Sequence, residues 1–139
     1  MNTEERNKEI ALMLGAIYSN YAEAWGFGNA KNIGSKMFDG IMYENVVEAQ
    51  RFEKELKFHS DWKWLMEAVY YLELKLVKPV VISQGMCIIN RGYAGESKKP
   101  YIRIDKWRMG SKEFDFDYKK EAVFIAISDF AKLYNNKEI

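Results

Sequence analysis

The chain has 139 residues, 48% of them hydrophobic and 15% aromatic, and it contains only two prolines. This composition excludes a disordered protein, because disorder requires a chain too poor in apolar side chains to offset the entropy lost on ordering. A single cysteine, Cys87, and a single histidine, His59, exclude an internal disulfide and a metal site made of clustered cysteines or histidines. The length predicts one domain over residues 1–139, and we expect no metal and no cofactor.

The sequence contains no pattern typical of a membrane or secretion segment. Its longest apolar run, residues 10–18, is shorter than the ~20 residues that span a bilayer. The first nine residues, MNTEERNKE, mix acidic and basic side chains, unlike a signal peptide. A lone cysteine fits a reducing compartment. We therefore expect a cytoplasmic protein with no membrane partner.

The charges are distributed unevenly, although the formal net charge is only +1. Residues 91–112 carry seven basic and two acidic side chains, a net charge of +5, which leaves −4 for the rest of the chain. A basic segment of this kind favours anionic partners, namely phosphates, nucleic acid or an acidic protein surface.

The first 56 residues predict two helices separated by a long loop. Thr3, followed by two glutamates, is typical of a helix start. Gly15 is a candidate for the end of this helix, which otherwise runs on towards Tyr21. Four glycines interrupt every apolar period between residues 21 and 45, which predicts a variable loop anchored by aromatic side chains. Residues 46–56 then predict a short helix.

Residues 58–76 predict the central helix of the fold. Ser60 is expected to cap it, with Asp61 at the positive end of the helix dipole. Apolar residues follow at helical spacing and form one broad stripe, which consists of Trp62, Leu65, Met66, Val69, Leu72 and Leu76. Trp64 lies off this stripe together with Tyr71, which indicates a second buried face against another layer or a second subunit. We therefore expect a homo-oligomer.

The remainder of the chain predicts strands and a final helix. Residues 80–82 and 86–89 are apolar and rich in β-branched side chains, and residues 101–107 alternate as a strand does. Asp115 or Asp117 is expected to cap a last helix that runs to about Asn135. The predicted fold class is α+β, with a small antiparallel sheet of two to four strands packed with about three helices.

Two stretches resemble a group of small phage and prophage proteins of Bacteroidetes bacteria. Residues 58–73, FHSDWKWLMEAVYYLE, are similar to the group's signature HSSWDWLMPVVEKIE, with Lys63 and Glu67 departing from it. Residues 120–135 are similar to its closing segment, SKIEAVYKAVVEFIKWYN, and residues 7–15 to its opening, LNKLIAEFMG. The resemblance fails between residues 16 and 56. It implies a fold near the phage ABA-sandwich domains, with an α/β/α sandwich-like arrangement, and it implies no activity or catalytic residue.

Three motifs invite a catalytic or metal-binding interpretation, and each has a simpler one. Residues 28–36, GNAKNIGSK, have the wrong spacing and context for a phosphate-binding loop of a nucleotide hydrolase. Cys87 lies in an apolar strand, where cysteine usually packs as a small hydrophobic residue, so a pairing with His59 for catalysis is disfavoured. Asp115 and Asp117 are too few for a hard metal ion. We therefore expect a protein that is not an enzyme.

The basic segment contains the best candidate for a binding site. Its strand is expected to place Tyr101, Arg103 and Trp107 on one face, where aromatic rings and cations can hold a base and its phosphate. The candidate ligand-binding residues are Arg91, Lys99, Tyr101, Arg103, Lys106, Trp107 and Arg108. The variable loop adds Trp25, Lys31 and Lys36.

Three functions follow from this pattern and from the resemblance. The first is a phage accessory protein with an anti-defence role, which sequesters a phosphate-bearing ligand such as a nucleotide immune signal in the cytoplasm of the bacterial host. The second is a protein-interaction module that inhibits a host factor through the loop of residues 21–45. The third is a nucleic-acid-binding protein, whose affinity would fall steeply with salt.

Overall fold

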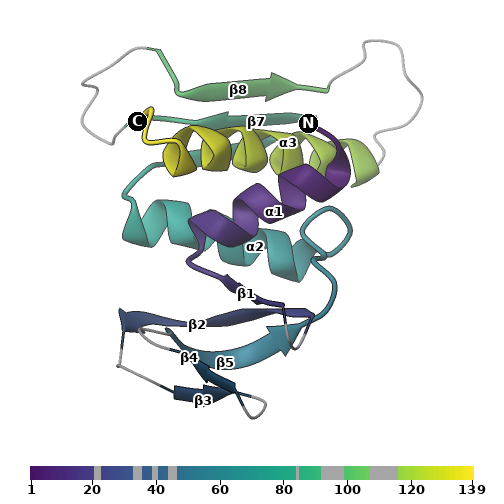
Figure 1. Cartoon of the computed structure of the whole chain (residues 1–139). Helices are drawn as coiled ribbons and strands as arrows, with labels where there is room; N and C mark the ends of the chain where they lie inside the picture. The colour runs from purple at the N-terminus through teal and green to yellow at the C-terminus, as the bar shows by residue number, and fades with distance from the viewer. Residues whose placement is uncertain are drawn as a thin grey trace.

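A computed structural model describes residues 1–20, 23–32, 36–38, 41–43, 47–83, 85–91, 99–106 and 116–139. For residues 28–32, 36–38, 41–43, 47–51 and 116–118 it describes the backbone alone. In this part of the chain there are three α-helices and two three-stranded antiparallel sheets, so the predicted α+β class is confirmed. Figure 1 shows the two sheets at opposite ends of the molecule, with helices between them.

The first helix, α1 (Thr3–Met13), begins where the sequence predicts. Its capping side chain is Asn2, whose Oδ1 accepts a hydrogen bond from the Glu5 amide at 2.8 Å. Gly15 ends the helix with a φ of +83°, a left-handed conformation that glycine adopts without a Cβ penalty. The amides of Gly15 and Ala16 donate to the carbonyls of Leu12 and Ala11, which is the Schellman arrangement.

Strands replace most of the predicted loop, and β5 occupies the greater part of the predicted second helix. The N-terminal sheet has the order β1-β2-β5, with β2 pairing antiparallel to both neighbours. Its strands are β1 (Ile17–Ser19), β2 (Ala24–Asn32) and β5 (Val47–Glu53). A separate pair of strands, β3 (Lys36–Phe38) and β4 (Ile41–Tyr43), lies between β2 and β5 in the sequence.

The predictions of a loop over residues 21–45 and of a helix over residues 46–56 are therefore wrong for the strand residues of these ranges, while residues 21–22, 33–35, 39–40 and 44–46 lie outside the described residues. Glycines in β2 mask its strand pattern, and the register of β2 against β5 shifts at Gly28, where an irregular pairing disrupts the simple alternation. The apolar spacing in β5 fits a helix locally, but pairing with β2 decides its conformation.

The central helix, α2 (Trp62–Tyr70), continues into one π-helical turn, η1 (Tyr71–Lys75). Asp61 caps it, because its carboxylate accepts from the Lys63 amide at 2.8 Å, so the assignment of the cap to Ser60 is wrong by one residue. The buried side chains on α2 are those of Trp64, Leu65, Ala68 and Val69, and Trp62 is only half-buried.

The C-terminal sheet has the order β6-β7-β8, again antiparallel throughout. Its strands are β6 (Val80–Ser83), β7 (Met86–Ile89) and β8 (Ile102–Asp105). The last helix, α3 (Phe116–Asn135), packs alongside β7 and against α1 (Figure 1). Cys87 and Ile89 are buried on the face towards the helices, whereas Val81, Arg103 and Asp105 are exposed on the opposite face.

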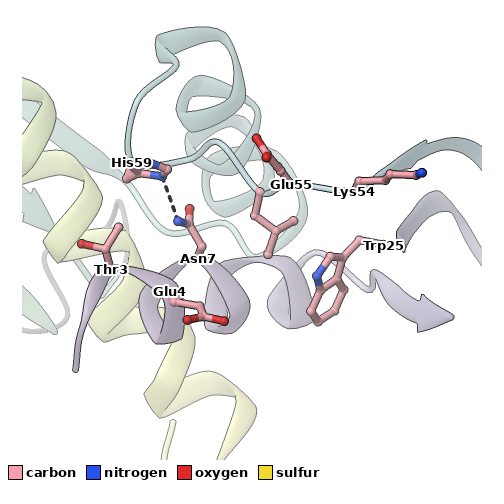
Figure 2. Close-up of a pocket in the computed structure, with 8 residues that line it drawn as sticks. Thr3, Glu4, Asn7, Trp25, Lys54, Glu55 and His59 are labelled. Atoms are coloured by element: carbon pink, nitrogen blue, oxygen red, sulfur yellow. Dashed lines mark hydrogen bonds between the residues drawn. The ribbon is translucent and has the colours of Figure 1, made fainter. Parts of the chain in front are cut away.

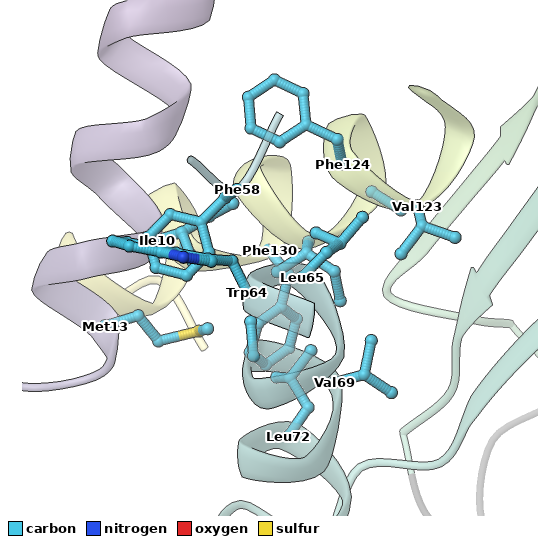
Figure 3. Packing of buried hydrophobic residues seen from close by; sticks show 14 of the residues in the cluster. Ile10, Met13, Phe58, Trp64, Leu65, Val69, Leu72, Val123, Phe124 and Phe130 are labelled. Carbon is cyan, nitrogen blue, oxygen red and sulfur yellow. The ribbon is translucent and has the colours of Figure 1, made fainter. Parts of the chain in front are cut away.

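The core is one cluster to which all three helices and both sheets contribute. Figure 3 shows Ile10 and Met13 from α1, Leu65 and Val69 from α2, and Val123 from α3 converging in it. None of the helices in the described ranges has a stretch long and apolar enough to pass through a bilayer.

The second buried face that Trp64 predicts is confirmed, and the N-terminal sheet covers it. The Trp64 ring makes edge contacts with Phe27 of β2 at 5.8 Å and with Phe58 at 5.1 Å between ring centroids. A homo-oligomer is predicted because this face needs a partner, and another layer of the same chain covers it. The oligomeric state stays a prediction.

Candidate anion-binding site

Three chain segments meet at one end of the C-terminal sheet. Because its strands are antiparallel, the start of β6, the end of β7 and the start of β8 lie side by side. Two backbone hydrogen bonds continue the sheet to this end, from the Asn90 amide to the Pro79 carbonyl at 2.8 Å and from the Tyr101 amide to the Ile89 carbonyl at 2.9 Å. The flanking residues of all three strands are thereby brought together.

Tyr101 is at the centre of this end of the sheet. Its ring makes an edge contact with Phe130 of α3, with the centroids 5.7 Å apart. The Arg91 guanidinium carbon lies 4.2 Å from the Tyr101 ring centroid, and Lys78 Nζ lies 5.2 Å from it. Both distances are within the range of cation–π attraction.

Hydrogen bonds to the backbone also position these cations. Arg91 Nε donates to the Lys99 carbonyl at 3.0 Å, and Lys78 Nζ donates to the Arg91 carbonyl at 3.1 Å. Lys78, Arg91, Lys99 and Tyr101 are called the basic cluster below. Arg91 and Lys99 are exposed, and Lys78 and Tyr101 are half-buried.

Two cations of the basic cluster, Lys78 and Arg91, lack a carboxylate partner in the part of the chain that the structure describes. Two other basic residues of the predicted site do have such partners, because Arg103 pairs with Asp105 at 3.1 Å and Lys106 with Glu121 at 3.4 Å. Cations without carboxylate partners are suited to hold an anion, and a guanidinium is suited to phosphate in particular.

The structure brings together three of the predicted ligand-binding residues, Arg91, Lys99 and Tyr101. The predicted platform that joins Tyr101 to Arg103 is wrong. Tyr101 precedes β8, so the alternation of the strand does not extend to it, and its ring packs towards α3 while Arg103 lies on the opposite face. Lys106 lies at the other end of the sheet, where its amide donates to the Gly85 carbonyl. Trp107 and Arg108 lie outside the described residues.

The three predicted loop residues are not brought together with the basic cluster in the described part of the chain. Trp25 is 9% exposed in β2 and contacts Tyr18 with ring centroids 5.3 Å apart, so it is a core residue. Lys31 lies in β2 and Lys36 in β3, and their side chains lie outside the description, as do the side chains of Asp115 and Asp117.

Lys78 belongs to the cluster although it lies outside the basic segment of residues 91–112. A charge count along the sequence does not find it, because 13 residues separate it from Arg91. The sequence does show that Lys78 lies just before the first predicted strand of an antiparallel sheet, and this position could have predicted its place in the cluster. Residues that flank the start of one strand and the end of the next share one end of the sheet.

The structure disfavours a pairing of Cys87 with His59. Cys87 is fully buried in β7, and burial raises the pKa of its thiol to about 12, so the nucleophilic thiolate is scarce at neutral pH. His59 is exposed, and its Nδ1 lies 2.9 Å from Asn7 Nδ2. Within the described ranges, no group of three or more histidine, cysteine, aspartate or glutamate side chains could hold a metal ion.

Comparison with family models finds no match, and comparisons with curated proteins and with solved structures find none either. The resemblance to phage proteins therefore stays a prediction, and the function has to be argued from the site.

Proposed function

We propose that the protein is a non-enzymatic binding protein that holds a phosphate-bearing small molecule at the basic cluster. The observation that supports this most is the placement of Arg91 and Lys78 on one tyrosine ring, with no carboxylate partner for either in the described part of the chain. The cluster is chemically suited to an anion, and a phosphate offers several acceptor oxygens to two cations at once.

The geometry assigns different roles to the two cations. Arg91 Nε donates to the Lys99 carbonyl, so the two terminal guanidinium nitrogens are the ones that can reach a ligand. Lys78 Nζ uses one of its three donors on the Arg91 carbonyl and retains two. The Tyr101 ring restrains both side chains before a ligand binds, which reduces the entropy lost on binding.

In this proposal the ligand is a nucleotide, and the protein acts in the cytoplasm of a bacterial host. The resemblance to phage proteins supports a role in sequestering a nucleotide immune signal. Two observations favour nucleotide binding over inhibition of a host protein. The basic cluster is suited to a phosphate, and the segment predicted to be the loop that contacts a host protein contains strands β2, β3 and β4.

Titration calorimetry with a panel of linear and cyclic nucleotides tests the proposal. We expect binding by the native protein and a loss of affinity of about tenfold or more in Arg91→Ala and in Lys78→Ala, because each removes a charge-assisted hydrogen bond. Lys8→Ala, which removes an exposed lysine of α1, is the matched control and should bind normally. Absence of heat with every nucleotide at millimolar concentration, or equal affinities for all three variants, would overturn the proposal.

The salt dependence of binding separates a nucleotide ligand from a nucleic acid. Binding of a nucleic acid releases several counterions, so its affinity falls steeply as salt rises. A single nucleotide engages few cations and should show a shallow dependence. A steep salt dependence with oligonucleotides, together with no binding of mononucleotides, would assign the cluster to nucleic acid instead.

A further inference from the structure

A pocket of about 460 Å³ lies away from the basic cluster, at the start of α1 (Figure 2). Its wall comes from the first turns of α1, from Trp25 of β2, from the segment after β5 and from His59. The lining residues are Thr3, Glu4, Asn7, Trp25, Lys54, Glu55, Leu56 and His59. This volume lies within the range of small-molecule sites, about 300–1,000 Å³.

Asn7 projects from α1 into the space between His59 and Glu55 (Figure 2). Its side chain is 5% exposed, and its Nδ2 lies 2.9 Å from His59 Nδ1. An amide nitrogen can only donate, so His59 Nδ1 accepts this hydrogen bond. His59 thereby sets the orientation of the amide, with Asn7 Oδ1 directed away from the imidazole.

Asn7 Oδ1 is buried and has no hydrogen-bond partner among the residues that the structure describes. An unsatisfied buried carbonyl costs about 1–3 kcal/mol, and native structures rarely leave one without a partner. Turning the amide would not remove the cost, because it would leave Nδ2 in the same position without an acceptor. Asn7 lines the pocket, and its buried Oδ1 is an oriented acceptor without a donor among the described residues; a ligand in the pocket reaches it once the side chains over it shift.

The remaining lining residues indicate what kind of molecule would supply this donor. Trp25 and Leu56 provide an aromatic and an apolar wall, which suits a planar body. Glu4 and Glu55 contribute negative charge, while Lys54 and the positive end of the α1 dipole oppose it. The charges nearly balance, which favours an uncharged ligand over an ion.

We propose that this pocket binds an uncharged, planar heteroaromatic molecule whose N–H group donates to Asn7 Oδ1, with His59 as the positioning residue. The site is independent of the proposed function, because it needs neither phosphate nor the basic cluster. 9-Methyladenine and 9-methylpurine, called adenine and purine below, are suitable probes, since methylation removes the ring N–H from both and they then differ only in the exocyclic amino group, which is the donor tested.

Proton–nitrogen correlation spectra of the full chain, titrated with each probe, test the proposal. We expect adenine to shift the side-chain amide of Asn7 and the indole N–H of Trp25, and to bind about fivefold or more tightly than purine, which lacks the donor. Arg91→Ala should leave adenine binding unchanged, which separates this site from the basic cluster.

Two variants complete the test. Asn7→Leu removes the acceptor at similar volume and should abolish the preference for adenine over purine. Leu56→Trp leaves Asn7 and His59 in place and fills the pocket from its wall, so adenine should no longer bind. Equal binding of adenine and purine, adenine binding that survives both variants, or no shift with adenine at millimolar concentration would overturn the proposal.

Discussion

Arg6 and Asn7 are adjacent on α1 and differ in how far their polar side-chain atoms find hydrogen-bond partners. Arg6 Nη1 donates to Asp129 Oδ1 at 2.6 Å and to Ser128 Oγ at 2.8 Å, both on α3. The Arg6 Nη1 group therefore meets acceptors on α3, as buried polar groups normally do. Asn7 satisfies only one end of its amide, with His59. The unsatisfied end is what distinguishes a candidate binding residue from a structural one.

Cys87 predicts a dependence of stability on alkaline pH. Burial holds the folded thiol protonated up to about pH 12, whereas the unfolded thiol loses its proton near pH 9. Between about pH 9 and about pH 12 the unfolded state binds fewer protons, so the free energy of unfolding falls as pH rises, by at most about 1.4 kcal/mol per pH unit. Below about pH 9 this contribution to stability is fully present.

Urea unfolding of the native chain and of Cys87→Ala across this range measures the effect. The variant should be less stable overall because it contains a cavity, but its stability should fall less steeply with pH. Burial, together with the neighbouring Tyr134, also raises the pKa of Tyr71, an effect that both proteins share. Equal slopes in the two proteins would contradict the prediction.

Gly15 ends α1 because of its backbone conformation. Gly15 has a left-handed φ of +83°, and a Cβ built on it would meet no atom within 4 Å. A substitution there is therefore costly only through its backbone conformation. The bonds from Gly15 and Ala16 back to the last turn satisfy carbonyls that would otherwise lack donors.

Gly15→Ala should lower the free energy of unfolding by about 1 kcal/mol, because a left-handed conformation costs an L-residue roughly 1–2 kcal/mol and the stiffer unfolded chain offsets part of it. Gly15→Asn should lower it less, since asparagine tolerates this region. Chemical denaturation of both variants gives the comparison. An unchanged or higher stability for the alanine variant would show that the left-handed φ is not required.

Helices α1 and α3 are joined by polar contacts as well as by apolar packing. Arg6 binds Asp129 near the start of α1, and Asn135 Nδ2 donates to the Glu9 carbonyl at 2.9 Å and to its carboxylate at 2.8 Å. These residues are 123 and 126 positions apart in the sequence. The two ends of the chain are thereby fixed against each other.

The two sheets depend on one aromatic contact region, in which Phe27 of β2 meets Phe58 and Trp64. The ring centroids of Phe27 and Phe58 lie 6.3 Å apart, and Phe58 is fully buried. This region connects the N-terminal sheet to the helices that support the C-terminal sheet. The basic cluster lies where β6 and β8 begin and shares no residue with this region, so the two should respond separately to mutation.

Phe27→Ala should lower the free energy of unfolding by about 3 kcal/mol or more, as truncation of a buried phenylalanine does. Amide hydrogen exchange should accelerate more in β1, β2 and β5 than in β6, β7 and β8, because the N-terminal sheet loses its main contact with the helices. Ile17→Ala, at a residue of β1 that is 42% exposed, is the control and should change stability by about 0.5 kcal/mol or less. Equal acceleration in both sheets would contradict this account.

Much of the helical part of the fold is predictable from the sequence. The start of α1, its end at Gly15 and the second buried face at Trp64 are confirmed by the structure. The cap of α2 is displaced by only one residue, from Ser60 to Asp61. These features depend on side chains within a few positions of one another, so local spacing and capping chemistry are sufficient to predict them.

The N-terminal sheet and the candidate sites were decided by tertiary structure. β2 and β5 pair across intervening residues, and glycine-rich sequence alone resembles a loop. The basic cluster combines Lys78, Arg91 and Tyr101 from the flanks of three strands, and the pocket combines Asn7 with His59, 52 residues further along the chain. Local apolar periods determined the α+β class, and a charge count determined the basic character of one segment, because both depend on residues that are near one another in the sequence. The contact of Lys78 and Arg91 with one tyrosine ring, and the unsatisfied amide oxygen of Asn7, depend instead on segments that are distant in the sequence and adjacent in the fold.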